Sequence, residues 1–105
     1  MRRFSYSLST DAQRDLAKLY LYLADQGDAS IGRKLVDSLL AKIASLASSG
    51  HVGVAREWLS PGLRAFPYEN RCVYFRVVDR NMRVLRILHG RQDVESSMFT
   101  DADAN

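Results

Sequence analysis

The residues of this chain best suited to chemistry are arginines, and they gather in one part of the sequence. Residues 56–91 hold eight arginines against three acids, a net charge of +5. Residues 92–105 hold four acids and no base, a net charge of −4. A guanidinium group can grip a carboxylate or a phosphate through two parallel hydrogen bonds, which an ammonium cannot. This distribution predicts an anionic partner for the middle of the chain.

Other kinds of site have little support in the sequence. Histidines occur only at positions 51 and 89, and Cys72 has no thiol or imidazole at ligand spacing, so no metal is expected. No glycine-rich phosphate loop is present, and no cofactor is expected. His89 and Asp93 resemble a base and its orienting group, but no nucleophile accompanies them. A strand-end histidine and a turn aspartate are the simpler interpretation.

Cleavage of RNA is the one reaction that the residues bring into consideration. It needs a base for the 2′-hydroxyl, cations for the developing charge and an acid for the leaving oxygen. His89 could carry a proton, but all three lysines fall in predicted helices and no tyrosine follows Tyr74. The cations would be Arg76, Arg83, Arg86 and Arg91. The groups for proton transfer are therefore few.

The composition indicates one globular domain without a membrane segment. The 105 residues are 47% hydrophobic and 26% charged, and no apolar run is long enough to cross a bilayer. The basic N-terminus has no apolar stretch behind it, so no signal peptide is expected. The single cysteine, Cys72, suits a reducing cytoplasm. We expect one domain over 1–99 and a disordered tail over 100–105.

The first half of the chain predicts a strand and a helix hairpin. Apolar residues alternate over residues 4–8, the pattern of a half-buried strand. A helix follows, with Thr10 and Gln13 as a possible capping box and Gly27 as its terminator. Asp28 is a predicted N-cap for a second helix that runs to about Ser48 and stops at Gly50. Its apolar stripe comprises Ile31, Leu35, Leu39, Ile43 and Leu46. Gly32 either permits close approach of the two helices or is tolerated slack.

The second half predicts three antiparallel strands and, with the first half, an α+β fold. Residues 51–61 read as a loop, with Trp58 and Leu59 folded back onto the body. Residues 63–66 form a short strand, and Pro67 marks it as an edge or a strand end. Residues 71–78 and 82–89 form a hairpin around residues 79–81.

The turn of this hairpin decides which side chains share a face. An even number of loop residues predicts one face of Val73, Phe75, Val77, Val84, Arg86 and Leu88. The other face would then hold Cys72, Tyr74, Arg76, Val78, Arg83, Leu85, Ile87 and His89. The first face is the more apolar and should pack on the helices, which leaves the second as a working surface. A three-residue loop would break this pairing.

Several segments, taken in order and spacing, resemble the ParE/RelE superfamily of bacterial toxins, and within it the ParE branch. They are residues 6–9, 12–16, 62–67, 73–77 and 84–93, which read YSLS, AQRDL, GLRAFP, VYFRV and VLRILHGRQD. The resemblance implies a helix hairpin on a small antiparallel sheet. It also implies a toxin of a type II toxin–antitoxin module. Such a toxin is bound by a ParD-like antitoxin and acts on DNA gyrase without catalysis or a cofactor.

Two alternatives remain beside gyrase inhibition. One is a ribosome-dependent mRNA endoribonuclease of the RelE type, although the missing sheet lysines and late tyrosine depart from that pattern. The other is an inactive relative that serves only in antitoxin binding and autoregulation. DNA would be met only through the antitoxin or gyrase.

The expected binding residues follow from the resemblance and from the arginine pattern. The residues expected to contact the target are Arg64, Arg76, Arg86, His89 and Arg91. Those expected to contact the antitoxin are Tyr20, Leu21, Tyr22, Tyr74, Arg76 and Arg83. Leu21 and Tyr22 either stay outside the core as a docking surface or pack under the loop that contains Trp58.

Overall fold

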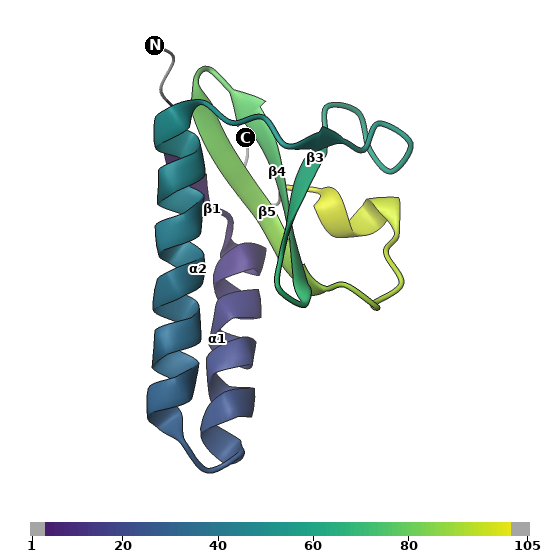
Figure 1. The fold of residues 1–105 in the computed structure, drawn as a ribbon. Helices are drawn as coiled ribbons and strands as arrows, with labels where there is room; N and C mark the ends of the chain where they lie inside the picture. The colour runs from purple at the N-terminus through teal and green to yellow at the C-terminus, as the bar shows by residue number, and fades with distance from the viewer. Residues whose placement is uncertain (1–3, 102–105) are drawn as a thin grey trace.

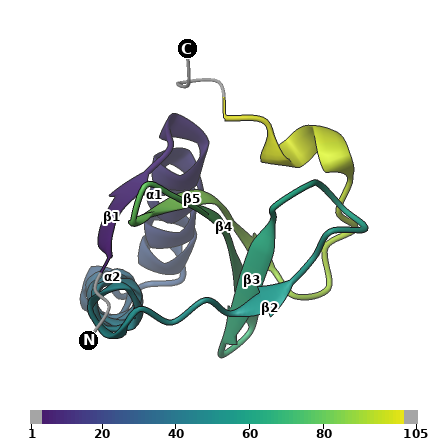
Figure 2. The same cartoon turned by 90° about the horizontal axis from the view of Figure 1, so that it is seen from above.

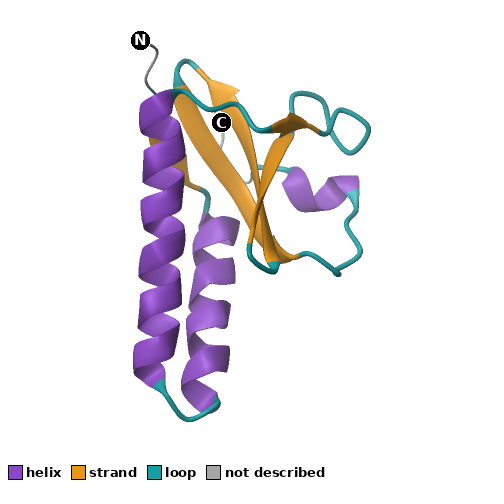
Figure 3. Ribbon diagram, in the orientation of Figure 1, coloured by secondary structure: helices purple, strands orange, loops and turns teal. Residues whose placement is uncertain are grey.

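A computed structural model describes residues 4–101, in which a helix hairpin covers one face of a five-stranded sheet (Figure 1). The elements are β1 (Ser5–Leu8), α1 (Thr10–Asp25), α2 (Ala29–Ser49), β2 (Val54–Ala55), β3 (Arg64–Tyr68), β4 (Arg71–Val78), β5 (Asn81–His89) and a 3-10 helix, η1 (Ser96–Phe99). Figure 3 shows the helices and strands in separate colours. The α+β expectation is confirmed, while β2 and η1 are additions to it.

The strand order in the sheet is β1-β5-β4-β3-β2. The first strand, β1, runs parallel to β5, and every other neighbouring pair is antiparallel. Pro67 lies inside β3 rather than at its end, but β2 pairs only with Arg64 and Ala65. Pro67 therefore stands on an open edge, where its missing N–H leaves no gap in the ladder.

The helices begin and end at residues with clear physical roles. Asp28 caps α2 by accepting a hydrogen bond from Ser30 N at 2.9 Å, and Gly50 ends it with a φ of 72°. The predicted capping box at Thr10 is wrong, because α1 is capped one residue earlier by Ser9. The Ser9 hydroxyl accepts from Ala12 N at 3.0 Å and donates to Leu85 O at 2.8 Å. The cap thus ties α1 to β5 as well.

The helix hairpin is tight near its loop and extends past the sheet (Figure 1). A Cβ on Gly32 would lie 3.2 Å from Tyr20 O and 3.3 Å from Leu23 Cβ, so glycine here permits the close approach of the two helices. Ile31, expected in the buried stripe of α2, is 55% exposed. It lies one turn from the hairpin loop, beyond the part of the hairpin that the sheet covers.

A β-bulge in β5 changes which side chains face the helices. The loop has the even length that fixes the parity: Asp79 and Arg80 form it, both with positive φ. Phe75 then pairs with Val84, but Tyr74 pairs with Arg86, so Leu85 is an extra residue without a partner of its own in β4. Past the bulge, Ile87 and Leu88 exchange the faces that the predicted parity gave them.

The bulge overturns part of the predicted division of faces. Ile87, expected on the working surface, packs in the core under the helices. Leu88, expected under the helices, packs on the opposite face. The face-sharing is as predicted for the strand residues before the bulge, among them Val73, Phe75 and Val84 on the helix side and Tyr74 and Leu85 on the other.

The face of the sheet away from the helices is covered by the C-terminal segment, as Figure 2 shows from above. Phe99 of η1 is 1% exposed and lies against Tyr74 with ring centroids 4.7 Å apart. Phe99 and Tyr74 belong to a second hydrophobic core on this face of the sheet. It also contains Leu59, Leu63, Ala65, Leu85 and Leu88. Trp58 does not fold back as expected: its side chain is 76% exposed, while Leu59 beside it is buried.

Of the expected disordered tail, residues 102–105 lie outside the described residues. Thr100 and Asp101 are described, and Asp101 forms an ion pair with Arg83. Within residues 4–101, neither helix combines the length and apolarity that crossing a bilayer requires.

The burial of Phe99 predicts that the C-terminal segment contributes to stability. Phe99→Ala should lower the free energy of unfolding by about 3 kcal/mol, because it opens a cavity in the second core. Trp58→Ala, which removes an equally aromatic but exposed side chain, should change it by less than about 0.5 kcal/mol. Urea denaturation monitored by far-ultraviolet circular dichroism measures both. Equal effects of the two variants would show that η1 does not anchor the sheet.

Candidate functional site

Arg86, one of the predicted target-binding residues, is committed to an internal ion pair. Its Nε and Nη2 donate to the two carboxylate oxygens of Asp15 at 2.8 and 2.9 Å. Asp15 Oδ2 also accepts from Ile87 N at 2.9 Å. The hydrogen bonds that Arg86 donates to Asp15 raise the pKa of its guanidinium. Arg86 therefore joins α1 to β5, and its main hydrogen-bonding edge is occupied by Asp15 rather than free for a target.

Arg76 and Arg83 bind the C-terminal segment. Arg83 grips Asp101 with its Nε and Nη2, at 2.8 and 3.2 Å from the two carboxylate oxygens. Arg76 donates to the backbone oxygens of Pro61 at 3.0 Å and Phe99 at 2.9 Å, and also to the Ser60 hydroxyl. These two arginines fasten the segment down over the second face of the sheet.

The predicted row of target-binding arginines is therefore divided. Arg64 donates to the backbone oxygen of Val52, and Arg76 and Arg86 are held as described above. Only His89 and Arg91, from the predicted set, line the larger of two hollows on the surface. The arginines alternate along the strands as expected, but most of them form hydrogen bonds or ion pairs within the protein.

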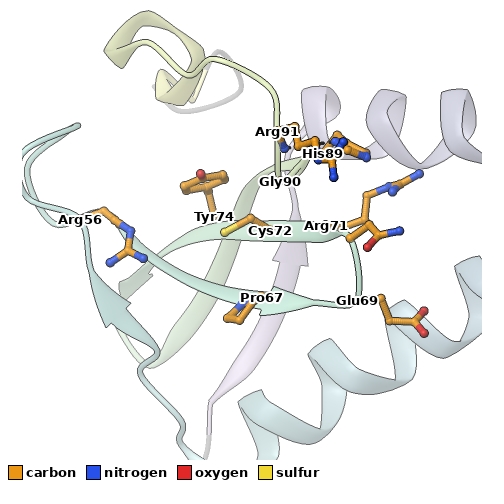
Figure 4. Close-up of a pocket in the computed structure, with 10 residues that line it drawn as sticks. Arg56, Pro67, Glu69, Arg71, Cys72, Tyr74, His89, Gly90 and Arg91 are labelled. Carbon is orange, nitrogen blue, oxygen red and sulfur yellow. Dashed lines mark hydrogen bonds between the residues drawn. The ribbon is translucent and has the colours of Figure 1, made fainter.

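That hollow has a volume of about 670 Å³ and lies between the β3–β4 turn and the loop after β5. Its cationic lining comes from three arginines, Arg56, Arg71 and Arg91, and His89 lies beside two of them. Figure 4 shows Arg56 on one side and Arg71, His89 and Arg91 gathered on the other, with Cys72 and Tyr74 between. We call this hollow the arginine cavity.

The cations of the arginine cavity are not neutralised from within. Among the ion pairs of residues 4–101, none is made by Arg56, Arg71 or Arg91. Glu69 is the one carboxylate in the lining, and in Figure 4 it points away from Cys72 and Tyr74. Positive charge on a concave surface raises the local concentration of anions, so the cavity is suited to an anionic group.

The floor of the cavity is neutral. Burial raises the pKa of the Cys72 thiol. Burial, together with the hydrogen bond to Cys72, raises the pKa of Tyr74 to about 12. Both groups are protonated at pH 7, so neither competes with an incoming anion for the arginines.

The imidazole of His89 is oriented by the backbone. Its Nδ1 accepts a hydrogen bond from Arg91 N at 3.1 Å. The neutral ring therefore carries its proton on Nε2 and can donate it to a ligand. Within residues 4–101, no group of three or more His, Cys, Asp or Glu side chains is arranged to hold a metal ion.

Arg56 and Arg71 were missed because their positions depend on features that the sequence hides. Arg71 pairs with His89 only because the bulge shifts the register of β4 and β5 by one residue. Arg56 reaches the cavity from the segment between β2 and β3, which has no hydrophobic period. The available signal in the sequence was the cluster of charge over residues 56–91. It does not show which side chains lie beside Arg56 or Arg71 in the fold.

The residues expected to contact an antitoxin fall into two places. Tyr20 is partly buried beside Gly32, whereas Leu21 and Tyr22 are 60% and 61% exposed on the projecting part of α1. The alternative that they pack under the Trp58 loop is wrong. The other group, Tyr74, Arg76 and Arg83, lies beneath the C-terminal segment.

Beside Tyr22 there is a second, smaller hollow of about 240 Å³ between α1 and β5. It is lined by residues of α1, by the start of β4 and by the end of β5 and the loop after it: Asp15, Lys18, Leu19, Tyr22, Arg71, Arg86, Ile87, Leu88, His89 and Gln92. The exposed apolar side chains thus border a groove with a basic lining.

The fold is shared with solved structures of toxin–antitoxin systems. One of them is described as the chromosomal ParDE TA system from P. aeruginosa, with a TM-score of 0.71 and 23% identity over 82% of this chain and 95% of that one. A toxin–antitoxin complex, RelBE2 from Mycobacterium tuberculosis, matches with a TM-score of 0.56 and 22% identity over 85% of this chain and 93% of that one. These two likenesses show that the fold is shared.

The particular branch comes from the sequence. The profile of the family described as the ParE toxin of type II toxin-antitoxin system, parDE, matches residues 6–94. The chain therefore belongs to the ParE toxin family of type II toxin–antitoxin systems. None of the curated proteins compared with it is a significant match.

The Asp15–Arg86 pair predicts a large effect from a small substitution. Asp15→Asn keeps the side-chain shape but leaves a mostly buried guanidinium without its counter-charge, so the free energy of unfolding should fall by about 3 kcal/mol. Asp37→Asn removes the partner of Arg33 on the exposed face of α2 and should cost less than about 0.5 kcal/mol. Denaturant titrations of the two variants make the comparison. Similar midpoints would mean that the buried pair contributes no more than a surface one.

Proposed function

We propose that this ParE-family toxin inhibits DNA gyrase by binding to it, without a covalent step of its own, and that a ParD-like antitoxin neutralises it. The observation that carries the proposal is the arginine cavity of this ParE-family fold, which is lined by His89 and by three arginines that form no ion pair within residues 4–101. Its ligand would be an anionic group of gyrase or of the DNA that gyrase holds. The protein would act in the cytoplasm, where gyrase works.

The lining of the cavity favours binding over RNA cleavage. A metal-free ribonuclease needs a group that accepts the proton of the 2′-hydroxyl near neutral pH. Tyr74 is a poor acceptor with its pKa raised to about 12, and Glu69, although part of the lining, points away from Cys72 and Tyr74. His89 alone remains for two proton transfers, while its Nδ1 already accepts from Arg91 N.

Gyrase inhibition predicts that the purified chain causes cleaved DNA to accumulate. In a reaction of gyrase, supercoiled plasmid and ATP, stopped with detergent and protease, linear DNA should increase with the concentration of the chain. Arg91→Ala should raise the concentration needed by about tenfold, the effect of losing one charge-assisted hydrogen bond. Arg33→Gln, which removes one charge from the exposed face of α2, should leave it unchanged.

Two results would count against this function. One is growth arrest by the expressed chain with neither cleaved DNA nor loss of supercoiling in the purified reaction. The other is codon-positioned cuts in translated mRNA by primer extension, which would assign the position of His89 to RNA cleavage.

The antitoxin is proposed to dock on the projecting part of the hairpin. Leu21 and Tyr22 lie outside the core and border the basic groove between α1 and β5. An acidic segment with apolar anchors, disordered until bound, would match this surface, since the anchors and arginine pairing offset its ordering cost. The antitoxin would contact Tyr74, Arg76 and Arg83 only if it displaced the C-terminal segment that covers them.

This docking site predicts a loss of antitoxin affinity on charge insertion. Leu21→Asp combined with Tyr22→Asp should weaken binding at least about tenfold, because it removes two apolar anchors and repels acidic residues. Val78→Asp, at the exposed end of the β4–β5 hairpin, should have little effect. Isothermal titration with the antitoxin encoded beside this chain measures both. Undiminished binding of the double variant would place the antitoxin elsewhere.

A further inference from the structure

We propose that the arginine cavity binds the phosphate backbone of a single nucleic-acid strand. This names the ligand chemistry of a site that the proposed function leaves open between protein and DNA. It rests on the proposed function only in placing that strand within a gyrase–DNA complex. The binding itself is a property of this chain and needs no gyrase.

The spacing of the cations carries the proposal. Arg56 lies at one end of the cavity, and Arg71, Arg91 and His89 lie at the other, with the uncharged side chains of Cys72 and Tyr74 between (Figure 4). A single small anion would occupy one end and leave the other unpaired. A ligand with negative groups at intervals along an extended chain would engage both ends.

The donor set is one that recognises phosphate. Three guanidinium groups and the Nε2 proton of His89 offer hydrogen bonds, and each guanidinium can span two oxygens of one phosphate. Contacts of this kind position a backbone and are indifferent to base sequence. The volume of about 670 Å³ takes a segment of one strand.

An acidic polypeptide is a weaker fit to the same place. Extended peptides usually bind beside a sheet by adding a strand to its edge, through backbone hydrogen bonds. The open edge of β3 next to the cavity carries Pro67, which has no N–H to donate. The affinity of this site must therefore come from side-chain cations, which a phosphate backbone supplies with partners at every unit.

The test is the salt dependence of binding to a short single strand. We would titrate a fluorescein-labelled oligothymidylate with the full chain at several salt concentrations and follow its anisotropy. The site variant is Arg56→Gln, Arg71→Gln and Arg91→Gln together. The matched control is Arg14→Gln, Arg33→Gln and Lys34→Gln, which removes the same three charges from the exposed helix faces.

The site variant should bind at least about 100-fold more weakly than the unaltered chain. Its slope of log affinity against log salt should be smaller by about 2, since each lost contact to a single strand removes about 0.7. The control variant should lose less than about threefold. A third variant with lysine at the three cavity positions should keep most of the slope and lose part of the affinity, because charge survives but the paired hydrogen bonds do not. The lysine variant carries the test if the glutamine variant is unstable by circular dichroism.

Three outcomes would overturn the proposal. The site and control variants could lose the same affinity, which would mean general attraction by net charge. The oligothymidylate could fail to bind at low salt. A poly-glutamate peptide could bind with the same arginine dependence while the oligonucleotide did not, which would assign the cavity to an acidic protein segment. None of these readings involves gyrase, so a failed plasmid cleavage assay with intact oligonucleotide binding would reject only the proposed target.

Discussion

The extra residue in β5 is the constraint on which the rest of the arrangement depends. Leu85 interrupts the ladder with β4 and is held there by the Ser9 hydroxyl, which donates to its carbonyl. Immediately after it, Asp15 receives both the Arg86 guanidinium and Ile87 N. The start of α1 thus replaces β1 as the neighbour of β5. A bulge is costly unless its freed backbone groups find partners, and here α1 supplies them.

The positions of Arg86 and Arg71 follow from that shift, whereas Arg76 and Arg83 lie before it. Arg86 is turned toward α1, Arg76 and Arg83 lie beneath the C-terminal segment, and Arg71 comes opposite His89. Arginine therefore forms ion pairs or hydrogen bonds within the protein at positions 76, 83 and 86. The arginines of the cavity form no ion pair within residues 4–101. A buried ion pair can cost as much in desolvation as it gains, so these internal contacts specify geometry as much as they add stability.

Much of the fold was predictable because its signals are local. The start of α2 at Asp28, its end at Gly50 and the short strand β1 depend on neighbours in the sequence. The errors arose from long-range effects. The bulge, the exposure of Trp58 and the burial of Phe99 depend on segments that meet only in the folded chain. The prediction of the site residues was incomplete for the same reason. Charge clustering located the region, but it could not show that Arg86 pairs with Asp15, 71 positions away in the sequence.

The pairing of β1 with β5 has a consequence for how the chain folds during its synthesis on the ribosome. The sole neighbour of β1 in the sheet is β5, and their register joins Ser5 to Asn81. While the ribosome is still making the middle of the chain, the helix hairpin can form but has no finished sheet to rest on. The strands β3, β4 and β5 emerge after the hairpin. The sheet, and every surface that it carries, can therefore form only after β5 has left the ribosome and paired with β1.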